Sequence, residues 1–270
     1  MRTLTTVVVF AALVFGAFAL TSHHRPKALR SAEAGTRSPV VVELFTSEGC
    51  SSCPPADALL AKLSEQQPVA NAEVIALEEH VDYWNDLGWM DPFSSREWTA
   101  RQYVYARPLG NGNPYTPQMV IDGQAELVGS NAGKARQLIQ QAAGEEKALV
   151  SLTQSNSAKS GAADFSAKVG PLTRSTKGDT AEIWLAVTET ALHSAVSRGE
   201  NAGEDLHHAA VVRAMRRIGE AQNAGESSFA GAVSVPLQPE WKRENLKAVV
   251  LVQEKKSRRI LGAAEIRVAQ

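Results

Sequence analysis

The chain has 270 residues, of which 44% are hydrophobic and 21% are charged, a composition typical of globular proteins. This length suits two modest domains, each able to bury a core of its own. The formal net charge of −1 excludes a strong overall attraction to nucleic acid or to anionic lipid. The sequence shows no nucleic-acid-binding motif, so no nucleic-acid partner is predicted.

The first 19 residues have the features of a signal peptide. Arg2 precedes an apolar run over residues 7–20, which is too short for a comfortable membrane span. Ala17-Phe18-Ala19 supplies the small residues of a cleavage site. We therefore predict an exported protein, periplasmic or secreted, with an uncleaved N-terminal anchor as the alternative and the one expected membrane contact. Residues 20–38 are polar and basic, which predicts a disordered spacer.

Both cysteines of the chain lie in one motif, Cys50-Ser51-Ser52-Cys53. In an oxidising compartment such a pair can form a structural disulfide. A disulfide that closes only two intervening residues removes little loop entropy, so stabilisation is a weak reason for this spacing. We therefore interpret the motif as a redox-active disulfide in which Cys50, the more exposed thiol, attacks and Cys53 resolves the mixed disulfide. The nearby charge of Glu48 opposes thiolate formation.

Apolar runs and turn residues predict a βαβαββα order for residues 39–146. The β-branched run at residues 40–45 is typical of a buried strand, and the cysteine motif follows it directly. Pro54-Pro55 then begins a helix, since proline is tolerated in the first helical turn. The later expected elements are a strand at 73–81, a helix from Ser94 or Ser95 to about 106, strands at 119–121 and 125–128 joined by an Asp122-Gly123 turn, and a helix at 132–143. This order indicates a mixed sheet with helices on both faces.

Thr116-Pro117 precedes the strand expected at 119–121. The strand, cysteine turn and helix resemble the start of a thioredoxin-type fold, in which the proline at this place is cis and faces the cysteines. The resemblance implies a cis bond here that shapes a substrate groove beside the cysteine pair. A trans proline that simply begins a strand is the alternative.

A polar and aromatic segment containing His80, Asp82, Tyr83 and Trp84 follows the second expected strand. Open α/β sheets bind ligands at this end of their strands, so His80 is a candidate proton carrier and the aromatic residues are candidate groove residues. Alternatively, the aromatic rings cover the sheet edge and His80 and Asp82 hydrogen-bond the loop. Zinc needs further Cys or His ligands, and the sequence near His80 offers none, so neither a metal site nor a cofactor is predicted.

The pattern of apolar and polar residues changes after Gly144. Short alternating runs separated by Gly, Ser, Asn and Pro clusters predict an all-β sandwich-like domain over residues 147–270. The expected strands are 148–152, 163–169, 181–188, 209–215, 229–235, 247–252 and 260–268. His207-His208 is interpreted as part of a solvated face, and Arg101 and Arg107 as solvated helix charges.

Several motifs resemble the DUF1223 family. They are residues 42–57 around the cysteines, His80-Val81-Asp82-Tyr83-Trp84, Asp91-Pro92-Phe93, residues 115–123, and the weaker matches at 200–206 and 208–213. The resemblance implies an exported bacterial protein of unestablished function, with plant relatives. It implies a thioredoxin-like α/β domain at residues 39–146, followed here by the β-sandwich-like domain.

The leading functional hypothesis is a periplasmic or secreted thiol–disulfide oxidoreductase-like protein that uses a Cys50–Cys53 disulfide on a protein thiol or disulfide partner. One alternative is a non-catalytic exported binding or assembly module with a structural disulfide. Another is a metal-handling protein that uses the cysteines as ligands. No Trp precedes Cys50 and the spacer is Ser-Ser, so the direction of electron flow stays open.

Overall fold

The computed structural model describes residues 37–109, 112–155, 161–221 and 228–269. The predicted signal peptide and the spacer up to residue 36 lie outside these residues, and Ser38 already belongs to the first strand. Among the described residues, no helix has the length and apolar composition needed to cross a membrane.

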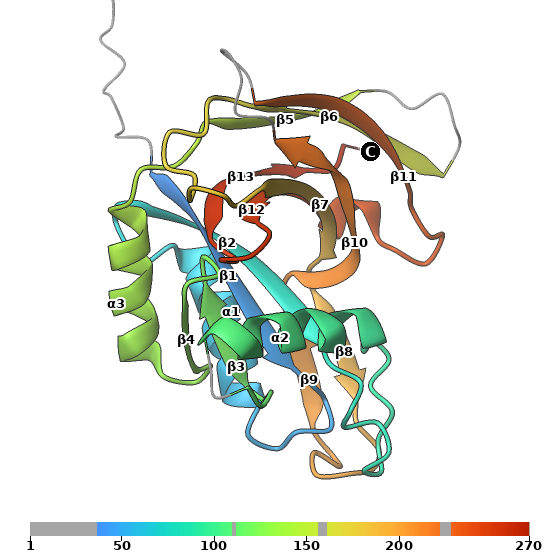
Figure 1. Cartoon of the computed structure of the whole chain (residues 1–270). Coiled ribbons are helices and arrows are strands. Elements are labelled where there is room, and N and C mark those ends of the chain that lie inside the picture. Colours follow the sequence, from blue (N-terminus) through green and yellow to red (C-terminus); the bar gives the residue numbers. More distant parts are fainter. Residues whose placement is uncertain (1–36, 110–111, 156–160, 222–227, 270) are drawn as a thin grey trace, which may run out of the picture. The chain divides into compact units, whose positions relative to one another are not determined.

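The N-terminal segment, residues 39–146, has the predicted βαβαββα order (Figure 1). Its elements are β1 (Ser38–Thr46), α1 (Pro54–Gln66), β2 (Ala72–His80), α2 (Arg96–Leu109), β3 (Gln118–Ile121), β4 (Ala125–Val128) and α3 (Ala132–Ala143). Pro54 and Pro55 begin α1 as predicted, and the helix ends where Gln67 adopts a left-handed conformation. Asp122 and Gly123 both have positive φ, the conformation that a tight hairpin turn requires between β3 and β4.

The C-terminal segment, residues 147–270, contains nine strands among the described residues, and all seven predicted runs contribute one. The strands are β5 (Val150–Ser155), β6 (Ala162–Val169), β7 (Ala181–Glu189), β8 (Leu192–Ala195), β9 (Asp205–His208), β10 (Val211–Ala221), β11 (Phe229–Pro236), β12 (Leu246–Glu254) and β13 (Ile260–Arg267). The sequence did not indicate β8 and β9, which are four residues long each and pair as a hairpin.

One large sheet joins the two segments, in the order β13-β12-β7-β10-β2-β1-β3-β4. β1 runs parallel to β2 and antiparallel to β3, so it lies at the centre of the N-terminal part. The join is a short parallel contact in which Val211 of β10 pairs with Glu78 of β2. The described residues of both segments accordingly belong to one compact unit. The fold is a mixed α/β structure with one large mixed sheet, and strands from both predicted domains belong to that sheet.

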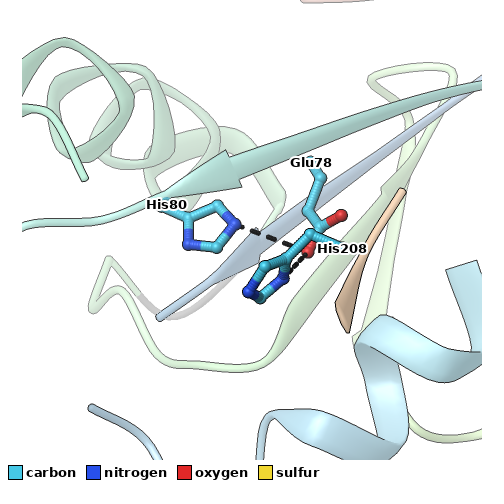
Figure 2. A group of neighbouring side chains, drawn as sticks. All are labelled: Glu78, His80 and His208. Atoms are coloured by element: carbon cyan, nitrogen blue, oxygen red, sulfur yellow. Dashed lines mark hydrogen bonds and ion pairs between the residues drawn. The ribbon is translucent and has the colours of Figure 1, made fainter. Parts of the chain in front are cut away.

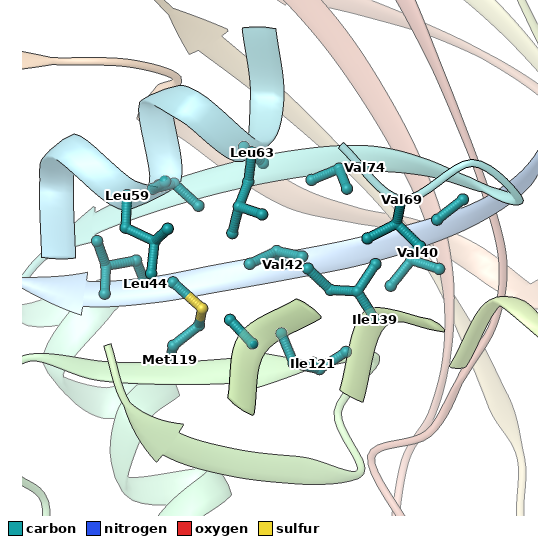
Figure 3. Close-up of a cluster of buried hydrophobic side chains, with 14 of the residues drawn as sticks. Val40, Val42, Leu44, Leu59, Leu63, Val69, Val74, Met119, Ile121 and Ile139 are labelled. Carbon is teal, nitrogen blue, oxygen red and sulfur yellow. The ribbon is translucent and has the colours of Figure 1, made fainter. Parts of the chain in front are cut away.

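Each face of β1 packs against different helices, because successive side chains of a strand point to opposite faces. Val42 and Leu44 of β1 pack with residues of α1 and α3, including Leu63 and Ile139, in the core shown in Figure 3. On the other face, Phe45 packs with Tyr105 of α2. The expected helices on both faces are therefore present.

A second core lies between β5, β6 and β11, which form a separate three-stranded sheet, and the strands β7, β12 and β13 of the large sheet. Phe165 and Ile183 are buried in it.

The packing is also close at the turn of the β3–β4 hairpin, since a Cβ on Gly123 would lie 1.9 Å from the carbonyl oxygen of Arg258. The turn between β12 and β13 therefore packs directly against the β3–β4 hairpin of the N-terminal segment.

Candidate functional site

The two cysteines form a disulfide in the turn between β1 and α1. The turn is held by backbone hydrogen bonds from Cys50 N–H to the carbonyl of Ser47 and from Cys53 N–H to the carbonyl of Cys50, both 3.1 Å. Both cysteines are 0% exposed. The prediction that Cys50 is the more exposed of the two cysteines is therefore wrong for the oxidised protein, although Ser51 and Ser52 between them are exposed.

A loop from the C-terminal segment lies against the cysteine turn. We call residues 199–203, between β8 and β9, the covering loop. The side-chain amide of Asn201 donates to the carbonyl oxygens of Glu48 (2.8 Å) and Cys50 (3.1 Å). Glu200 accepts hydrogen bonds from both the backbone N–H (3.1 Å) and the hydroxyl (2.7 Å) of Ser51. The loop thus bonds to the residues on both sides of Cys50.

Beside the cysteine turn lies a buried group of charged side chains, which we call the histidine–carboxylate cluster: Glu48, Glu78, His80, Asp91 and His208. Two ring nitrogens approach one oxygen of Glu78, with His208 Nδ1 2.8 Å and His80 Nε2 3.4 Å from Oε1 (Figure 2). The other nitrogen of each ring faces a further carboxylate, since His208 Nε2 lies 3.0 Å from Glu48 and His80 Nδ1 lies 2.7 Å from Asp91. Four carboxylate–histidine contacts therefore link β2, β9 and the cysteine turn.

Backbone and indole groups complete the cluster. Asp91 also accepts the backbone N–H of Glu48 at 2.8 Å, and the indole of Trp89 donates to the other oxygen of Glu48 at 2.7 Å. The backbone N–H of Ala209 donates to Glu78 Oε2 at 2.8 Å. These bonds satisfy the carboxylates that would otherwise be buried at a high cost in free energy.

The cluster has strongly shifted pKa values. Burial by itself lowers the pKa of His208, but the charge of Glu78 and the hydrogen bonds to Glu48 and Glu78 outweigh it and raise the pKa of His208 to about 9. Burial raises the pKa of Glu78, yet His208 and His80 lower it to about 2. Near neutral pH the two groups are thus an imidazolium and a carboxylate.

Asp57 of α1 extends this charge system towards the helix that follows the disulfide. Burial, together with the charge of Glu78, raises the pKa of Asp57 to about 7. Its carboxylate accepts a hydrogen bond of 2.7 Å from Thr46. A group that titrates near neutral pH therefore lies one helical turn after Cys53.

The remaining predicted site residues lie in two places. The indole of Trp84 donates to the hydroxyl of Thr116 at 2.8 Å, and a Cβ on Gly49 would lie 3.1 Å from Trp84. Trp84 therefore connects the cysteine turn to Thr116, and the bond from Thr116 to Pro117 is cis as predicted.

Tyr83 and Asp82 both bond to α2, and Tyr83 also hydrogen-bonds Thr116. Tyr83 donates to Gln102 at 3.2 Å, and Asp82 accepts a hydrogen bond of 2.6 Å from Thr99, both residues of α2. The side chain of Asp82 therefore bonds to α2, and Tyr83 also reaches Thr116, which precedes cis Pro117. His80 faces the buried cluster.

A second buried charged group lies on the opposite face of the sheet, and we call it the arginine cluster: Glu43, Glu79, Arg101, Tyr105 and Gln253. Arg101 contacts Glu43 at 2.6 Å and Glu79 at 3.3 Å, and Gln253 donates to the hydroxyl of Tyr105 at 2.6 Å. The prediction that Arg101 is a solvated helix charge was wrong, because Arg101 pairs with two buried carboxylates. Arg107 is exposed as predicted.

Sequence reasoning missed His208, Glu78 and Asn201. His207 and His208 are adjacent, but their side chains are 73% and 1% exposed. The interpretation as a solvated face therefore holds for His207 and was wrong for His208. A second histidine does lie near His80, from a strand 128 residues further along the chain. One signal in the sequence could have identified Asn201 and His208: they lie in the motifs at residues 200–206 and 208–213 that resemble the family.

The fold and site define a mixed α/β protein with a disulfide between a central strand and a helix, beside buried histidines. The family described as "Protein of unknown function (DUF1223)" matches residues 41–253. The chain belongs to the DUF1223 family, as the sequence motifs indicated.

Two solved structures are similar over most of the chain. Protein AGR_C_4864 from Agrobacterium tumefaciens is 26% identical, with a TM-score of 0.62 over 87% of this chain and 96% of that protein. HBP35 of Porphyromonas gingivalis is 17% identical, with a TM-score of 0.63 over 86% of this chain and 76% of that protein, which shows a shared fold. No curated protein shows significant similarity to the chain.

Proposed function

We propose that this chain is an exported thiol–disulfide oxidoreductase-like protein that exchanges its Cys50–Cys53 disulfide with a protein partner. The observation that carries the proposal is the position of the disulfide, in the turn between central strand β1 and α1. A cysteine at the start of a helix has a lowered thiol pKa, which favours exchange. The strand order β2-β1-β3-β4, with β1 and β2 parallel, supports a thioredoxin-like N-terminal segment.

The exchange proceeds in two balanced steps. A thiolate of the partner attacks Cys50, a partner–Cys50 disulfide forms, and Cys53 leaves as a thiolate. A second partner thiolate then attacks the partner sulfur, so the partner leaves oxidised and Cys50 leaves as a thiolate. Two electrons pass to the cysteine pair. In the reverse direction, Cys50 attacks a partner disulfide and Cys53 resolves the mixed disulfide.

The covering loop controls access in this proposal. Because both cysteines are buried, a partner thiolate reaches Cys50 only after Asn201 and Glu200 release the cysteine turn. In this proposal the partner chain then contacts Thr116, Pro117 and Trp84, since Trp84 connects Thr116 to the cysteine turn.

The test is to trap the mixed disulfide in cells. In the Cys53→Ser variant the mixed disulfide with Cys50 is not resolved, so we expect covalent partners that disappear when reductant is added. The Cys50→Ser variant is the matched control and traps none at that position. An empty trap in Cys53→Ser, with the purified variant folded, would contradict the proposal.

The second candidate is a non-catalytic binding or assembly module with a structural disulfide. The complete burial of both cysteines favours it. It predicts that Cys50→Ser leaves the cellular phenotype intact, whereas changes at the covering loop or at the Tyr83–Trp84 segment abolish it. The redox proposal predicts that Cys50→Ser abolishes the phenotype.

A further inference from the structure

Three side chains from distant parts of the chain direct one ligand atom each to a common point. They are Glu78 and His80 at the end of β2 and His208 at the end of β9 (Figure 2). Glu78 Oε1, His80 Nε2 and His208 Nδ1 lie within 4.8 Å of one another, and all three residues are buried. His80 Nε2 is a buried atom with no hydrogen-bond partner, and its nearest charge is Glu78, at 3.4 Å.

We propose that Glu78, His80 and His208 bind one divalent transition-metal ion of the Zn²⁺ type. Zinc binds imidazole nitrogens and carboxylate oxygens at roughly 2.0–2.2 Å, which places ligand atoms roughly 3.3–3.5 Å apart in a tetrahedral site. The two distances to Glu78 Oε1, 2.8 and 3.4 Å, are close to that requirement. The proposal requires the two ring nitrogens, which lie within 4.8 Å of each other, to move to the same spacing when the ion binds.

The surroundings of the two rings favour a metal site. In metal sites, a histidine ligand donates its other ring N–H to a carboxylate, which orients the ring and selects the tautomer. Both rings have such a partner, Asp91 for His80 at 2.7 Å and Glu48 for His208 at 3.0 Å. A buried ion pair alone does not require that two histidines share one carboxylate and that each has a second carboxylate on its other ring nitrogen.

The ligand set contains no sulfur, so this site differs from a metal site built on the cysteine pair. Two imidazoles and one carboxylate suit zinc and its first-row neighbours rather than Ca²⁺ or Mg²⁺, which prefer oxygen ligands alone. The inference does not depend on the proposed disulfide exchange, because the cysteines take no part in binding.

Metal binding also has a structural consequence. His208 ends β9, and β9 begins directly after the covering loop and Glu204. An ion shared by His208 and β2 therefore ties the β8–β9 hairpin, and with it the covering loop, to the large sheet. Zinc is expected to increase the hydrogen-exchange protection of residues 192–208.

The experiment is equilibrium dialysis of the full chain with Zn²⁺, compared across matched variants. We expect the unsubstituted protein to bind one equivalent of Zn²⁺, and we expect His80→Gln and His208→Gln to lose it. Asp91→Asn should bind Zn²⁺ roughly 10- to 100-fold more weakly, because the side chain of Asp91 orients His80. His207→Gln is the control, because His207 is adjacent on β9 but exposed. The double variant Cys50→Ser/Cys53→Ser keeps the full equivalent.

A second measurement keeps the proposal testable if a histidine variant does not fold. Co²⁺ bound to the unsubstituted protein should give two paramagnetically shifted imidazole N–H signals that exchange slowly, one from each ring bonded to a buried carboxylate. No stoichiometric uptake, uptake that survives in both folded histidine variants, or uptake lost with the cysteines would overturn the proposal. The last result would leave the disulfide-exchange proposal untouched.

Discussion

The two buried charged clusters lie on opposite faces of the same strands, yet they have different chemistry. Glu78 and Glu79 are neighbours on β2, and the alternation of a strand directs them to opposite faces. Glu79 faces Arg101, whose guanidinium stays charged at any ordinary pH. Glu78 faces two histidines, whose charge changes with pH or when a cation binds. The Arg101 cation of the arginine cluster is therefore permanent, although burial raises the pKa of Glu79 well above its usual value, whereas the cations of the histidine–carboxylate cluster depend on pH or on a bound cation.

The position of each cluster makes this difference relevant to function. Glu48 of the responsive cluster is two residues from Cys50, and its carbonyl accepts a hydrogen bond from the covering loop. On the other face, the arginine cluster links α2 to β1 and β12, because Arg101 of α2 bonds to Glu43 and Gln253. The responsive group thus lies beside the disulfide, and the permanent one supports the sheet.

Removing the C-terminal segment breaks both clusters and has the largest expected effect on the stability of the fold. A chain that ends at residue 146 lacks His208 and Gln253, and it uncovers the apolar face around Ile75 and Leu77, which packs with Val212 and Leu251. We expect no cooperative urea transition for this fragment by circular dichroism, and a single transition for the full chain. A fragment that unfolds cooperatively would show that the N-terminal segment is an independent domain.

Breaking the arginine cluster alone should cost less. Arg101→Met leaves Glu43 and Glu79 buried without a cation, so the free energy of unfolding should fall by about 3–5 kcal/mol. Arg107→Met, on the same helix but exposed, should change it by less than about 0.5 kcal/mol. Equal effects in urea titrations would show that the ion pairs of Arg101 do not stabilise the fold.

The histidine–carboxylate cluster should make stability depend on pH. The pKa of His208 is raised from 6.5 to about 9, so its contribution is fully present below pH 6.5 and is lost as the pH rises through 9. With a chelator present, the unsubstituted protein should exceed His208→Gln in stability by about 2–3 kcal/mol at pH 6, and the difference should shrink towards pH 10. His207→Gln should follow the unsubstituted protein. A difference independent of pH would mean that His208 is neutral in the folded chain.

The sequence predicted local structure well and long-range contacts poorly. Residues 40–45 and the Asp122-Gly123 turn carry strong local signals, so β1 and the β3–β4 hairpin were predictable. β8 and β9 were not, because each has only four residues and few large apolar side chains, and only β9 has buried residues, Leu206 and His208. The cysteines and cis Pro117 were found from their motifs. The pairing of β10 with β2 has no local signal, and it is this contact that brings His208 to Glu78.

The central claim is that Cys50–Cys53 is a redox centre shielded by the covering loop. Its most direct test is the rate at which excess dithiothreitol reduces the disulfide in the unsubstituted protein, in Asn201→Ala and in the control Asn71→Ala. Asn71 is exposed and immediately precedes β2, at the end of that strand opposite to His80. Asn201→Ala removes two hydrogen bonds to the cysteine turn, each contributing about 0.5–1.5 kcal/mol, so reduction should be roughly tenfold faster. Asn71→Ala should match the unsubstituted rate. A disulfide that resists reduction equally in all three proteins would contradict the claim and favour a structural role.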